Sequence, residues 1–325
     1  MKKRALITGI TGQDGHHLTA FLTSREYEVI GLVSNERDQR HRSFATKFPD
    51  VRLLAGDLSD YESLRDVMRE VEPDEIYNLA ALSFVASSFN DPERTADVTG
   101  LGALRLFEAV RSLDGLKQCR IYQASSSEMF GQAEVEPQNE NTPFKPVSPY
   151  AVSKVFAHHS AQMYRKAYGM HISCGILFNH EGEYRGHEFV TRKISSNVAR
   201  IALGKQANFA LGALTPQRDW GYAGDSVEAM WLMLQQEIPD DYVIATGLCH
   251  SVYEFVEVAL RVAGLQGKVE DYVTLNPELI RPAEVSKLRG DASKADRVLG
   301  WRPRVDFEGL VELMVKSDMR WEAGN

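Results

Sequence analysis

Several features that mark other classes of protein are missing from this sequence. No apolar run approaches the roughly 20 residues that a membrane helix needs, and the apolar stretch after the basic residues 1–4 is interrupted at Thr8, which leaves it too short for a signal-peptide core. The three cysteines, Cys119, Cys174 and Cys249, are widely spaced and form no Cys-x-x-Cys pair. This pattern favours free thiols and no zinc site. We therefore expect a cytoplasmic protein that neither enters nor contacts a membrane.

Positive charge is also scarce. Lysine and arginine total 37 against 45 acidic residues, which gives a net charge of −8 and a pI near 5.7. A generally basic nucleic-acid-binding surface is excluded, so an anionic ligand would need specific cationic side chains. No histidine and carboxylate spacing forms a metal set, and we predict no metal. The paired histidines are accordingly assigned structural roles, and they are His16, His17, His158 and His159.

The N-terminus carries the order of elements that a dinucleotide site requires. A short apolar strand, residues 4–8, leads into Gly9-Ile-Thr-Gly12-Gln-Asp-Gly15 and then into a helical segment to residue 24. Gly9 permits a tight turn, Gly12 lets the backbone approach a pyrophosphate, and Gly15 lets the helix pack on the strand. The spacing is GxxGxxG, and its place directly after the first strand favours a dinucleotide site.

The end of the second strand, residues 28–33, leaves the choice of cofactor open. Glu36 at the adenosine ribose would favour NAD, whereas Arg37 would favour NADP, and Arg40 and Arg42 follow closely. An exposed charged loop is the competing interpretation. After a third strand, 51–55, the turn at Asp57 and Leu58 could meet the adenine edge.

Strands and helices alternate through the first half of the chain. Further apolar strands are expected at 75–80, 120–124, 172–178 and 242–245, with helices at 61–70, 95–112, 149–169 and 226–236. Continuously apolar strands separated by helices indicate an α/β protein with a doubly wound, Rossmann-like parallel sheet. Residues 181–212 look loop-rich and basic in patches, and the tail after residue 250 looks mainly helical. We predict a dinucleotide domain of residues 1–178 and about 219–247, and a smaller, mainly helical substrate domain of about 179–218 and 248–325.

One stretch sets a phenol and an amine on the same helix face. Ser148 suits an N-cap and Pro149 the first helical position, so Tyr150 and Lys154 should lie one turn apart. A lysine beside a phenol favours the phenolate and can bring its pKa from about 10 toward neutrality, which would make a general base. A chance pair on a solvated helix is the alternative.

A serine and acid cluster, Ser125-Ser-Ser-Glu128, follows the strand at 120–124. The cluster could be only a capping box. However, ligands of doubly wound sheets bind at the carboxyl ends of the strands. The serines and Glu128, the glycine loop and the Tyr150/Lys154 pair should therefore converge on one crevice.

With these motifs in order, the chain resembles the extended short-chain dehydrogenases/reductases and, more narrowly, the GDP-mannose 4,6-dehydratase family. The matching segments span nearly the whole chain and include ITGITGQDG, DEIYNLAA, YQASSSEMFG, SPYAVSK, GILFNHE, RDWGYAGD and RPAEV. The resemblance implies a homo-oligomer, dimer or tetramer, with bound NADP and a GDP-sugar substrate. It also implies conversion of GDP-mannose to GDP-4-keto-6-deoxymannose by internal hydride transfer from C4 to C6.

The resemblance also assigns roles by position. Tyr150 would remove the C4 hydroxyl proton with Ser126 as a relay, Lys154 would hold the nicotinamide ribose, and Glu128 would take the C5 proton and protonate the leaving C6 hydroxyl. The implied cofactor contacts are Gly9, Thr11, Gly12, Gln13, Asp14, Gly15, Arg37, Asp57, Leu58, Leu79, Ala80, Ala81, Ser83, Tyr150, Lys154, His180 and Arg185. The implied substrate contacts are Ser83, Ser126, Glu128, Asn179, Val190, Lys193, Arg218, Arg281 and Glu284.

Some positions depart from the family pattern. Ser126 stands where the family usually has threonine, Leu82 replaces a glutamine beside the sugar pocket, and Gly182-Glu183 replaces Ser-Pro. The segment SNERDQRHR lacks the family's adjacent arginines, so NAD is not excluded. A related substrate such as a GDP-heptose, an epimerase or reductase without elimination, and a cofactor-bound regulatory or scaffold protein without catalysis all stay open as alternatives.

Overall fold

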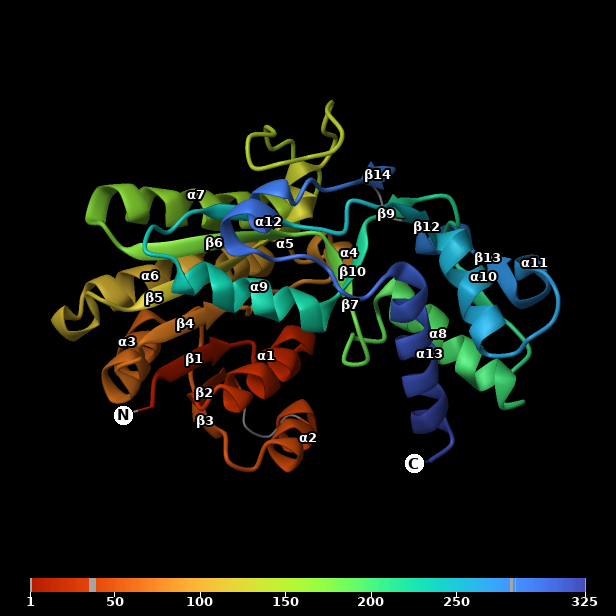
Figure 1. The fold of residues 1–325 in the computed structure, drawn as a ribbon, viewed down its shortest axis with the longest axis horizontal. Coiled ribbons are helices and arrows are strands. Elements are labelled where there is room, and N and C mark those ends of the chain that lie inside the picture. Colours follow the sequence, from red (N-terminus) through yellow and green to blue (C-terminus); the bar gives the residue numbers. More distant parts are fainter. Residues whose placement is uncertain (1, 35–38, 281–282, 284, 325) are drawn as a thin grey trace.

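The computed structural model describes residues 2–34, 39–280, 283 and 285–324. Three residues of the predicted sites, Arg37, Arg281 and Glu284, lie outside this part of the chain. Within it, the molecule has a larger part built on one sheet and a smaller, mainly helical part beside it (Figure 1).

The larger part is built on a seven-stranded sheet in which all strands are parallel. From one edge to the other the order is β11, β6, β5, β4, β1, β2, β3. In chain order these strands are β1 Arg4–Thr8, β2 Glu28–Val33, β3 Arg52–Ala55, β4 Glu75–Asn78, β5 Arg120–Ser126, β6 His171–Leu177 and β11 Asp241–Ile244. The strand order reverses between β1 and β4, so the doubly wound α/β fold predicted from the sequence is confirmed.

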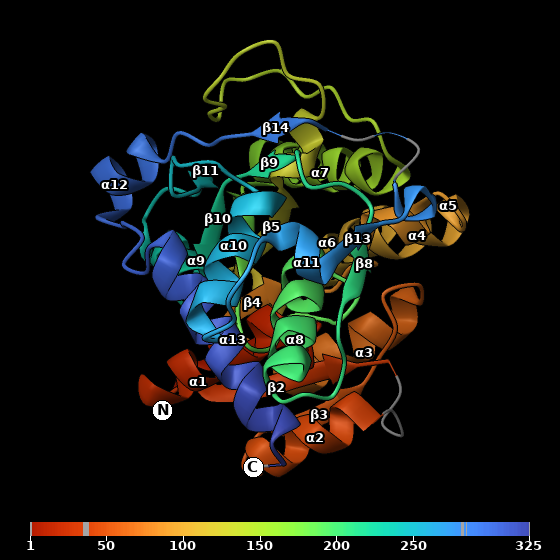
Figure 2. The same ribbon diagram turned by 90° about the vertical axis from the view of Figure 1, so that its right-hand side faces the viewer.

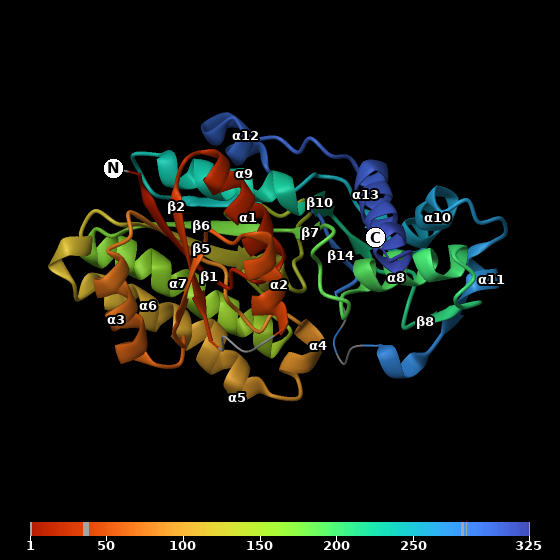
Figure 3. The same cartoon turned by 90° about the horizontal axis from the view of Figure 1, so that it is seen from below.

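Helices cover both faces of this sheet, which explains why its strands are apolar throughout. One face packs on α3 Tyr61–Val71, α6 Gly102–Arg111 and α7 Pro149–Tyr168. The other face packs on α1 Gln13–Ser24, α2 Gln39–Lys47, α9 Ala223–Gln235 and α12 Ser293–Leu299. The view from below separates the two helical layers (Figure 3).

Several predicted boundaries were wrong. The single helix expected at 95–112 is three segments: α5 Pro92–Thr95, a π-helical turn η1 Ala96–Leu101, and α6. The strand expected at 75–80 ends at Asn78, and α2 was not predicted. The expected loop-rich segment 181–212 contains the 13-residue helix α8 Val190–Ala202, whose apolar side chains pack against α10 Val252–Val262 and α13 Phe307–Glu322.

The smaller part is built around that helical core. Trp220 is buried with α8, α10 and α13, and three short sheets border them (Figure 2). These sheets consist of β7 Asn179–Glu181 with β10 Trp220–Tyr222, β8 Phe209–Leu211 with β13 Val273–Leu275, and β9 Gln217–Arg218 with β12 His250–Ser251 and β14 Lys287–Leu288. A short helix, α11 Val269–Tyr272, also belongs to this part, whereas α4 Val85–Ser88 follows β4 and contacts α7 in the larger part.

Two predictions about absent features can be compared with the described residues. Cys119, Cys174 and Cys249 all carry free thiols, as predicted. None of the helices in the described part of the chain is both long enough and apolar enough to span a membrane.

The glycine loop gives a direct test of the fold. A Cβ at Gly15 would lie 2.0 Å from the carbonyl oxygen of Ile10, so Gly15→Ala must displace backbone. We expect it to lower the free energy of unfolding by about 1–3 kcal/mol. The measurement is urea unfolding, and Gly115→Ala is the control because no atom lies within 4 Å of its Cβ position. Equal effects of the two substitutions would contradict the packing.

Candidate active site

The glycine loop is shaped to bring backbone close to a ligand. Gly9 has φ +68°, and a Cβ there would lie 2.9 Å from Ala80 Cα. Gly12 is the N-cap of α1 and supplies no side-chain cap, so the positive end of this helix faces outward. Gln13 Oε1 is buried without a hydrogen-bond partner among the described residues. An uncapped helix end with an unsatisfied buried oxygen beside it fits the pyrophosphate and ribose hydroxyls of a dinucleotide.

A chain of side-chain hydrogen bonds links this loop to the Tyr150/Lys154 helix across three strand ends. The hydroxyl of Thr8 on β1 donates to Asn78 Oδ1 on β4 at 2.7 Å, and Asn78 Nδ2 donates to Gln123 Oε1 on β5 at 2.7 Å. Gln123 Nε2 then donates to the Ala124 carbonyl, which also accepts from Lys154 Nζ at 2.8 Å. All these groups are buried or half-buried, so the bonds fix the strand ends relative to one another.

The Tyr150/Lys154 pair lies at the start of α7, as predicted. The Ser148 hydroxyl caps the helix by accepting from Ala151 N at 3.1 Å, and Pro149 is the first helical residue. Both Tyr150 and Lys154 are more than 90 % buried. The pair is therefore not part of a solvated helix face.

The serine and acid cluster lies beside the pair. Ser126 is the last residue of β5 and caps the 3-10 turn η3 Ser127–Phe130 by accepting from Glu128 N at 3.2 Å. The Ser126 side chain also lies close enough to the Tyr150 phenol to lower its pKa. The predicted capping role is thus present, but the same hydroxyl contacts the phenol. The structure brings Ser126, Glu128, Tyr150 and Lys154 together.

The electrostatics of the pair differ from the prediction. Burial raises the pKa of Tyr150 to about 12, against the effects of the Ser126 side chain and the positive charge of Arg185. Burial also lowers the pKa of Lys154 to about 8. The Lys154 ammonium donates to the Ala124 carbonyl and lies 5.8 Å from the centre of the Tyr150 ring. The prediction that Lys154 brings the tyrosine pKa toward neutrality was wrong for the protein alone, because desolvation of the phenolate outweighs the cations nearby.

A half-buried ion pair joins the start of α1 to β7. Asp14, in the first turn of α1, lies 2.9 Å from His180 Nε2, and Gln13 Nε2 donates to the His180 carbonyl at 2.9 Å. The Nε atom of Arg185 lies 2.9 Å from Oε2 of Glu181, and its guanidinium stacks over the Phe189 ring. The predicted cofactor contacts Gln13, Asp14 and His180 are therefore neighbours, although they lie about 165 residues apart in sequence.

The remaining predicted cofactor residues follow the carboxyl ends of the central strands. Thr11 lies in the glycine loop, Asp57 and Leu58 follow β3, and a further group follows β4. That group consists of Leu79, Ala80, Ala81 and Ser83.

The predicted substrate residues come from the smaller part of the molecule. Asn179 is on β7, Val190 and Lys193 are in the first turn of α8, and Arg218 is on β9 and buried. Arg192, the neighbour of Lys193, pairs instead with Asp318 of α13 at 2.8 Å. None of the ion pairs among the described residues involves Lys193, which suits a cation that meets an external phosphate.

Sequence analysis missed the residues that position these groups. Asp219, fully buried next to Arg218, accepts hydrogen bonds from the backbone N–H of Thr246, Gly247 and Gly290. It joins β9 to two loops and so fixes Arg218. The structural roles of Asn78 and Gln123 were also missed. Their polar side chains within otherwise apolar strands were the signal that could have indicated them.

The Asp14/His180 pair predicts a pH-dependent contribution to stability. Burial alone would raise the pKa of Asp14, but His180 lowers it to about 2. Asp14 in turn raises the pKa of His180 above 6.5, against desolvation. The aspartate contribution is present above pH 3.8 and is lost as pH falls toward 2. The histidine contribution is present below pH 6.5 and is lost as pH rises through its folded pKa.

We therefore expect His180→Asn to cost about 2 kcal/mol near pH 5.5 and less at pH 8 and above. Thermal unfolding across this pH range measures the difference from the wild type. His187→Asn, at an exposed position, is the control and should leave the profile unchanged. A His180→Asn deficit that does not vary with pH would contradict the ion pair.

Comparison with known proteins gives a consistent family. The family model described as GDP-mannose 4,6 dehydratase matches residues 6–314. The chain is 52% identical to "GDP-mannose 4,6 dehydratase 1" of Arabidopsis thaliana over 98% of this chain and 90% of that one. It is 46% identical to the human "GDP-mannose 4,6 dehydratase", with 97% and 91% covered.

Solved structures of related enzymes share the fold. The Thermus thermophilus UDP-glucose 4-epimerase complex with NAD superposes with TM-score 0.85 at 28% identity, covering 97% of this chain and 98% of that one. RMD from Pseudomonas aeruginosa, complexed with NADPH, superposes with TM-score 0.82 at 25% identity, covering 98% and 100%. Together with the glycine loop, the Tyr150/Lys154 pair and Glu128 at one crevice, these matches show that the chain belongs to the GDP-mannose 4,6-dehydratase family.

Proposed function

We propose that the protein is a lyase that converts GDP-mannose to GDP-4-keto-6-deoxymannose. One observation carries the proposal: Glu128 stands at the end of β5 beside Ser126, whose hydroxyl lies next to Tyr150. A tyrosine and lysine alone suit oxidation of a sugar hydroxyl. An added carboxylate within the same strand end supplies the acid and base that elimination of water requires.

The side chains divide the proton transfers between them. Tyr150 takes the C4 hydroxyl proton, with the Ser126 hydroxyl as relay, because the two groups lie beside each other. With a pKa of about 8, Lys154 carries its proton at neutral pH and can hold the nicotinamide ribose. The positive charge of Arg185 lowers the pKa of Tyr150 against the effect of burial. Bound NADP would supply the chemistry of hydride removal from C4 and hydride return to C6.

Oxidation at C4 makes the C5 proton acidic, which gives Glu128 its role. Its carboxylate removes the C5 proton and, once protonated, gives a proton to the departing C6 hydroxyl. Each transfer by a placed group contributes roughly 10²–10⁴ in rate. The charged pyrophosphate of the GDP-sugar would be held by Lys193, Arg218 and Arg281, since guanidinium and ammonium groups bind phosphate oxygens well in a closed pocket.

We propose NADP as the cofactor, with NAD as the alternative. The support is the basic character of the segment after β2, where Arg37, Arg40 and Arg42 follow Glu36. A ribose 2′-phosphate would gain a charge-assisted hydrogen bond from an arginine there, whereas Glu36 would repel it. The nucleotide that copurifies with the protein, identified by mass spectrometry, decides between the two.

We also propose the division into two domains predicted from the sequence. α9 and β11 pack with the main sheet, while α8, α10 and α13 share a separate core. Within the C-terminal segment, however, α12 packs on the main sheet. The dinucleotide would lie on the sheet's carboxyl edge, and the GDP-sugar between that edge and the helical domain.

Glu128→Gln tests the elimination step. The substitution keeps the shape of the side chain but removes its ability to take the C5 proton. We expect formation of the dehydrated 4-keto sugar to fall by about 10²–10⁴-fold, and exchange of the C5 hydrogen with deuterated water to fall with it. Mass spectrometry of the GDP-sugar measures both, and binding of GDP-mannose should change little.

The control and the alternatives are distinguished in the same experiment. Tyr150→Phe should block oxidation itself. Turnover of the GDP-sugar without loss of water, unchanged in Glu128→Gln, would favour an epimerase or reductase without elimination. Turnover of a GDP-heptose and not of GDP-mannose by the wild type would change the substrate but keep the reaction. Absence of C5 exchange with any GDP-sugar would favour a protein without catalysis.

We propose a homo-oligomer formed through one face of α7. Val152, Phe156 and Met163 lie within 40° of one another around the helix axis, given 100° per residue, and are 54%, 43% and 46% exposed. The turn η1 packs against this helix, so that a Cβ at Gly100 would meet Phe156 at 3.4 Å, and it adds the exposed Leu101. A helix face with several exposed apolar side chains suits a two-fold interface with a second copy.

Phe156→Asp tests this interface. A carboxylate on each copy would be buried against its partner, so we expect the oligomer to dissociate toward a smaller species at micromolar concentration. Mass spectrometry under non-denaturing conditions gives the mass. Ile238→Asp is the matched control, because Ile238 is 78% exposed and lies on the loop after α9. Retention of the wild-type mass by Phe156→Asp would contradict the proposed face.

A further inference from the structure

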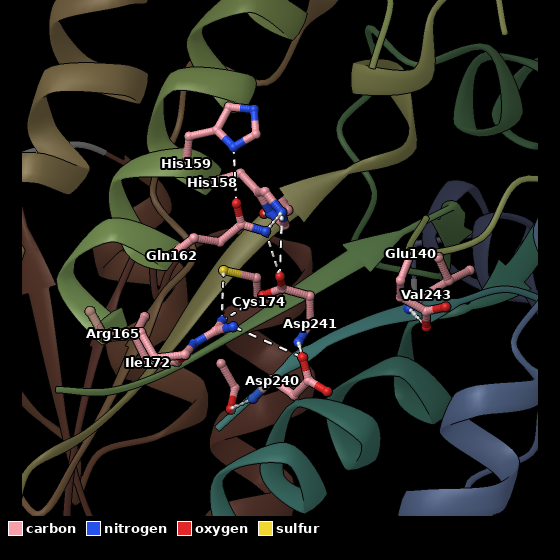
Figure 4. A network of polar contacts seen from close by, with 12 residues as sticks. Glu140, His158, His159, Gln162, Arg165, Ile172, Cys174, Asp240, Asp241 and Val243 are labelled. Atoms are coloured by element: carbon pink, nitrogen blue, oxygen red, sulfur yellow. Dashed lines mark hydrogen bonds and ion pairs between the residues drawn. The ribbon is translucent and has the colours of Figure 1, made fainter. Parts of the chain in front are cut away.

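Six polar side chains next to the candidate site form a closed ring of contacts that none of the proposed roles uses. They come from one helix and three strands and are Ser125 on β5, His158, Gln162 and Arg165 on α7, Cys174 on β6 and Asp241 on β11. Figure 4 shows the labelled members converging between α7 and the sheet edge. Ser125, His158, Cys174 and Asp241 are each at least 90% buried.

The direction of the hydrogen bonds follows from the chemistry of the partners. The carboxylate of Asp241 only accepts, so the atom 2.7 Å from its Oδ2 is the amide nitrogen of Gln162. The same nitrogen lies 3.1 Å from His158 Nε2, which must therefore accept. The proton of the neutral imidazole is then on Nδ1, which donates to Ser125 Oγ at 2.8 Å. Burial lowers the pKa of His158 to about 4, which keeps the ring neutral.

The ring closes through the thiol and the guanidinium. The Ser125 hydroxyl accepts from His158 and also lies close enough to the Cys174 thiol to lower its pKa. Arg165 Nη2 lies 3.9 Å from that sulfur and donates to Asp241 Oδ1 at 2.5 Å. Each member thus has a partner on both sides, and the ring ties α7 to the last three strands of the sheet.

The ring does not have the properties of a metal site. Ligand atoms of His158, Cys174 and Asp241 lie within 4.8 Å of one another. However, the Arg165 guanidinium already contacts two of the three, and burial raises the pKa of the Cys174 thiol, which a metal would need as thiolate. The protein's own cation occupies the place that a metal would take.

The position of the ring connects it to the proposed reaction. Ser125 lies between Ala124, whose carbonyl accepts from Lys154, and Ser126, which lies beside Tyr150. On α7, Tyr150, Lys154 and His158 are spaced four residues apart and face the same strand. Ala124 and Ser125 are therefore hydrogen-bonded to two consecutive turns of α7, and the next residue of β5, Ser126, lies beside Tyr150 of the preceding turn.

We propose that His158, acting through Ser125, is a positioning residue that fixes the β5 end, with Ser126 and Glu128, relative to Tyr150 and Lys154. This role rests on the proposed dehydratase function. No hydrogen bond, ion pair or ring contact within the described part of the chain joins His158 to Asn179, Lys193 or Arg218. Loss of His158 should therefore affect the rate of chemistry more than substrate binding.

Three variants test the role by steady-state kinetics with GDP-mannose. His158→Phe fills the space but cannot donate to Ser125, and we expect kcat to fall by about 10- to 100-fold with KM within about twofold of the wild type. In His158→Asn an amide N–H can take the place of the His158 Nδ1–H, so kcat should lie within about threefold of the wild-type value. Ser125→Ala should lower kcat as His158→Phe does. A further variant that combines Ser125→Ala with His158→Phe should have a kcat no lower than that of either single variant.

The control is His171→Phe, the same substitution at the amino end of β6, where the ring nitrogen Nε2 makes no hydrogen bond with the described residues. It should keep the wild-type kcat. Wild-type kcat in His158→Phe, equal loss in His158→Phe and His158→Asn, or a loss confined to KM would each overturn the proposal.

A second measurement does not depend on the substrate. Hydrogen exchange of the backbone amides of residues 124–130 should be at least about tenfold faster in His158→Phe than in the wild type and unchanged in His171→Phe. Unchanged exchange in His158→Phe overturns the positioning role. If the wild type produces no keto sugar but exchange is still faster in His158→Phe than in the wild type, the positioning role is supported and only the proposed function is rejected.

Discussion

The hydrogen bond from Lys154 to the carbonyl of Ala124 is the constraint on which the rest of the candidate site depends. It joins the helix that carries Tyr150 to the strand that carries Ser126 and Glu128. The same carbonyl ends the chain of bonds from Thr8 through Asn78 and Gln123. A buried ammonium needs partners, so the bond that satisfies Lys154 also sets the distance between the two groups of candidate catalytic residues.

In the function that we propose, the two parts of the molecule divide the work of binding. The parallel sheet presents its strand ends and the uncapped start of α1 along one edge, where backbone groups and small residues suit a dinucleotide. The helical part contributes its cations from α8 and β9 and holds Arg218 in place through Asp219. The Asp14/His180 pair joins the two contributions, because Asp14 is on α1 and His180 on β7. Chemistry and recognition thus meet across a boundary that a single sheet could not provide.

Local patterns were sufficient to predict the sheet, the glycine loop and the start of α7. Apolar strands, the glycine spacing and the Ser148-Pro149 cap each carry their structural reason within a few residues. The features that were predicted wrongly depend on residues that are distant in the sequence. α8 is stabilised by contacts with α10 and α13, and the pKa of Tyr150 reflects burial that no short segment reveals. The hydrogen-bonded rings and chains across strand ends, including Ser125 with His158, require the folded sheet order, which sequence spacing does not show.

The attachment of α7 to the sheet has an evolutionary consequence. Along this helix Tyr150, Lys154, His158, Gln162 and Arg165 all face β5, β6 or β11. Inserting or deleting a single residue would turn every later side chain by about 100° around the axis and separate it from its partner. The length of α7 between Tyr150 and Arg165 is therefore constrained during divergence, so that insertions or deletions near this helix should fall in the loops that flank it.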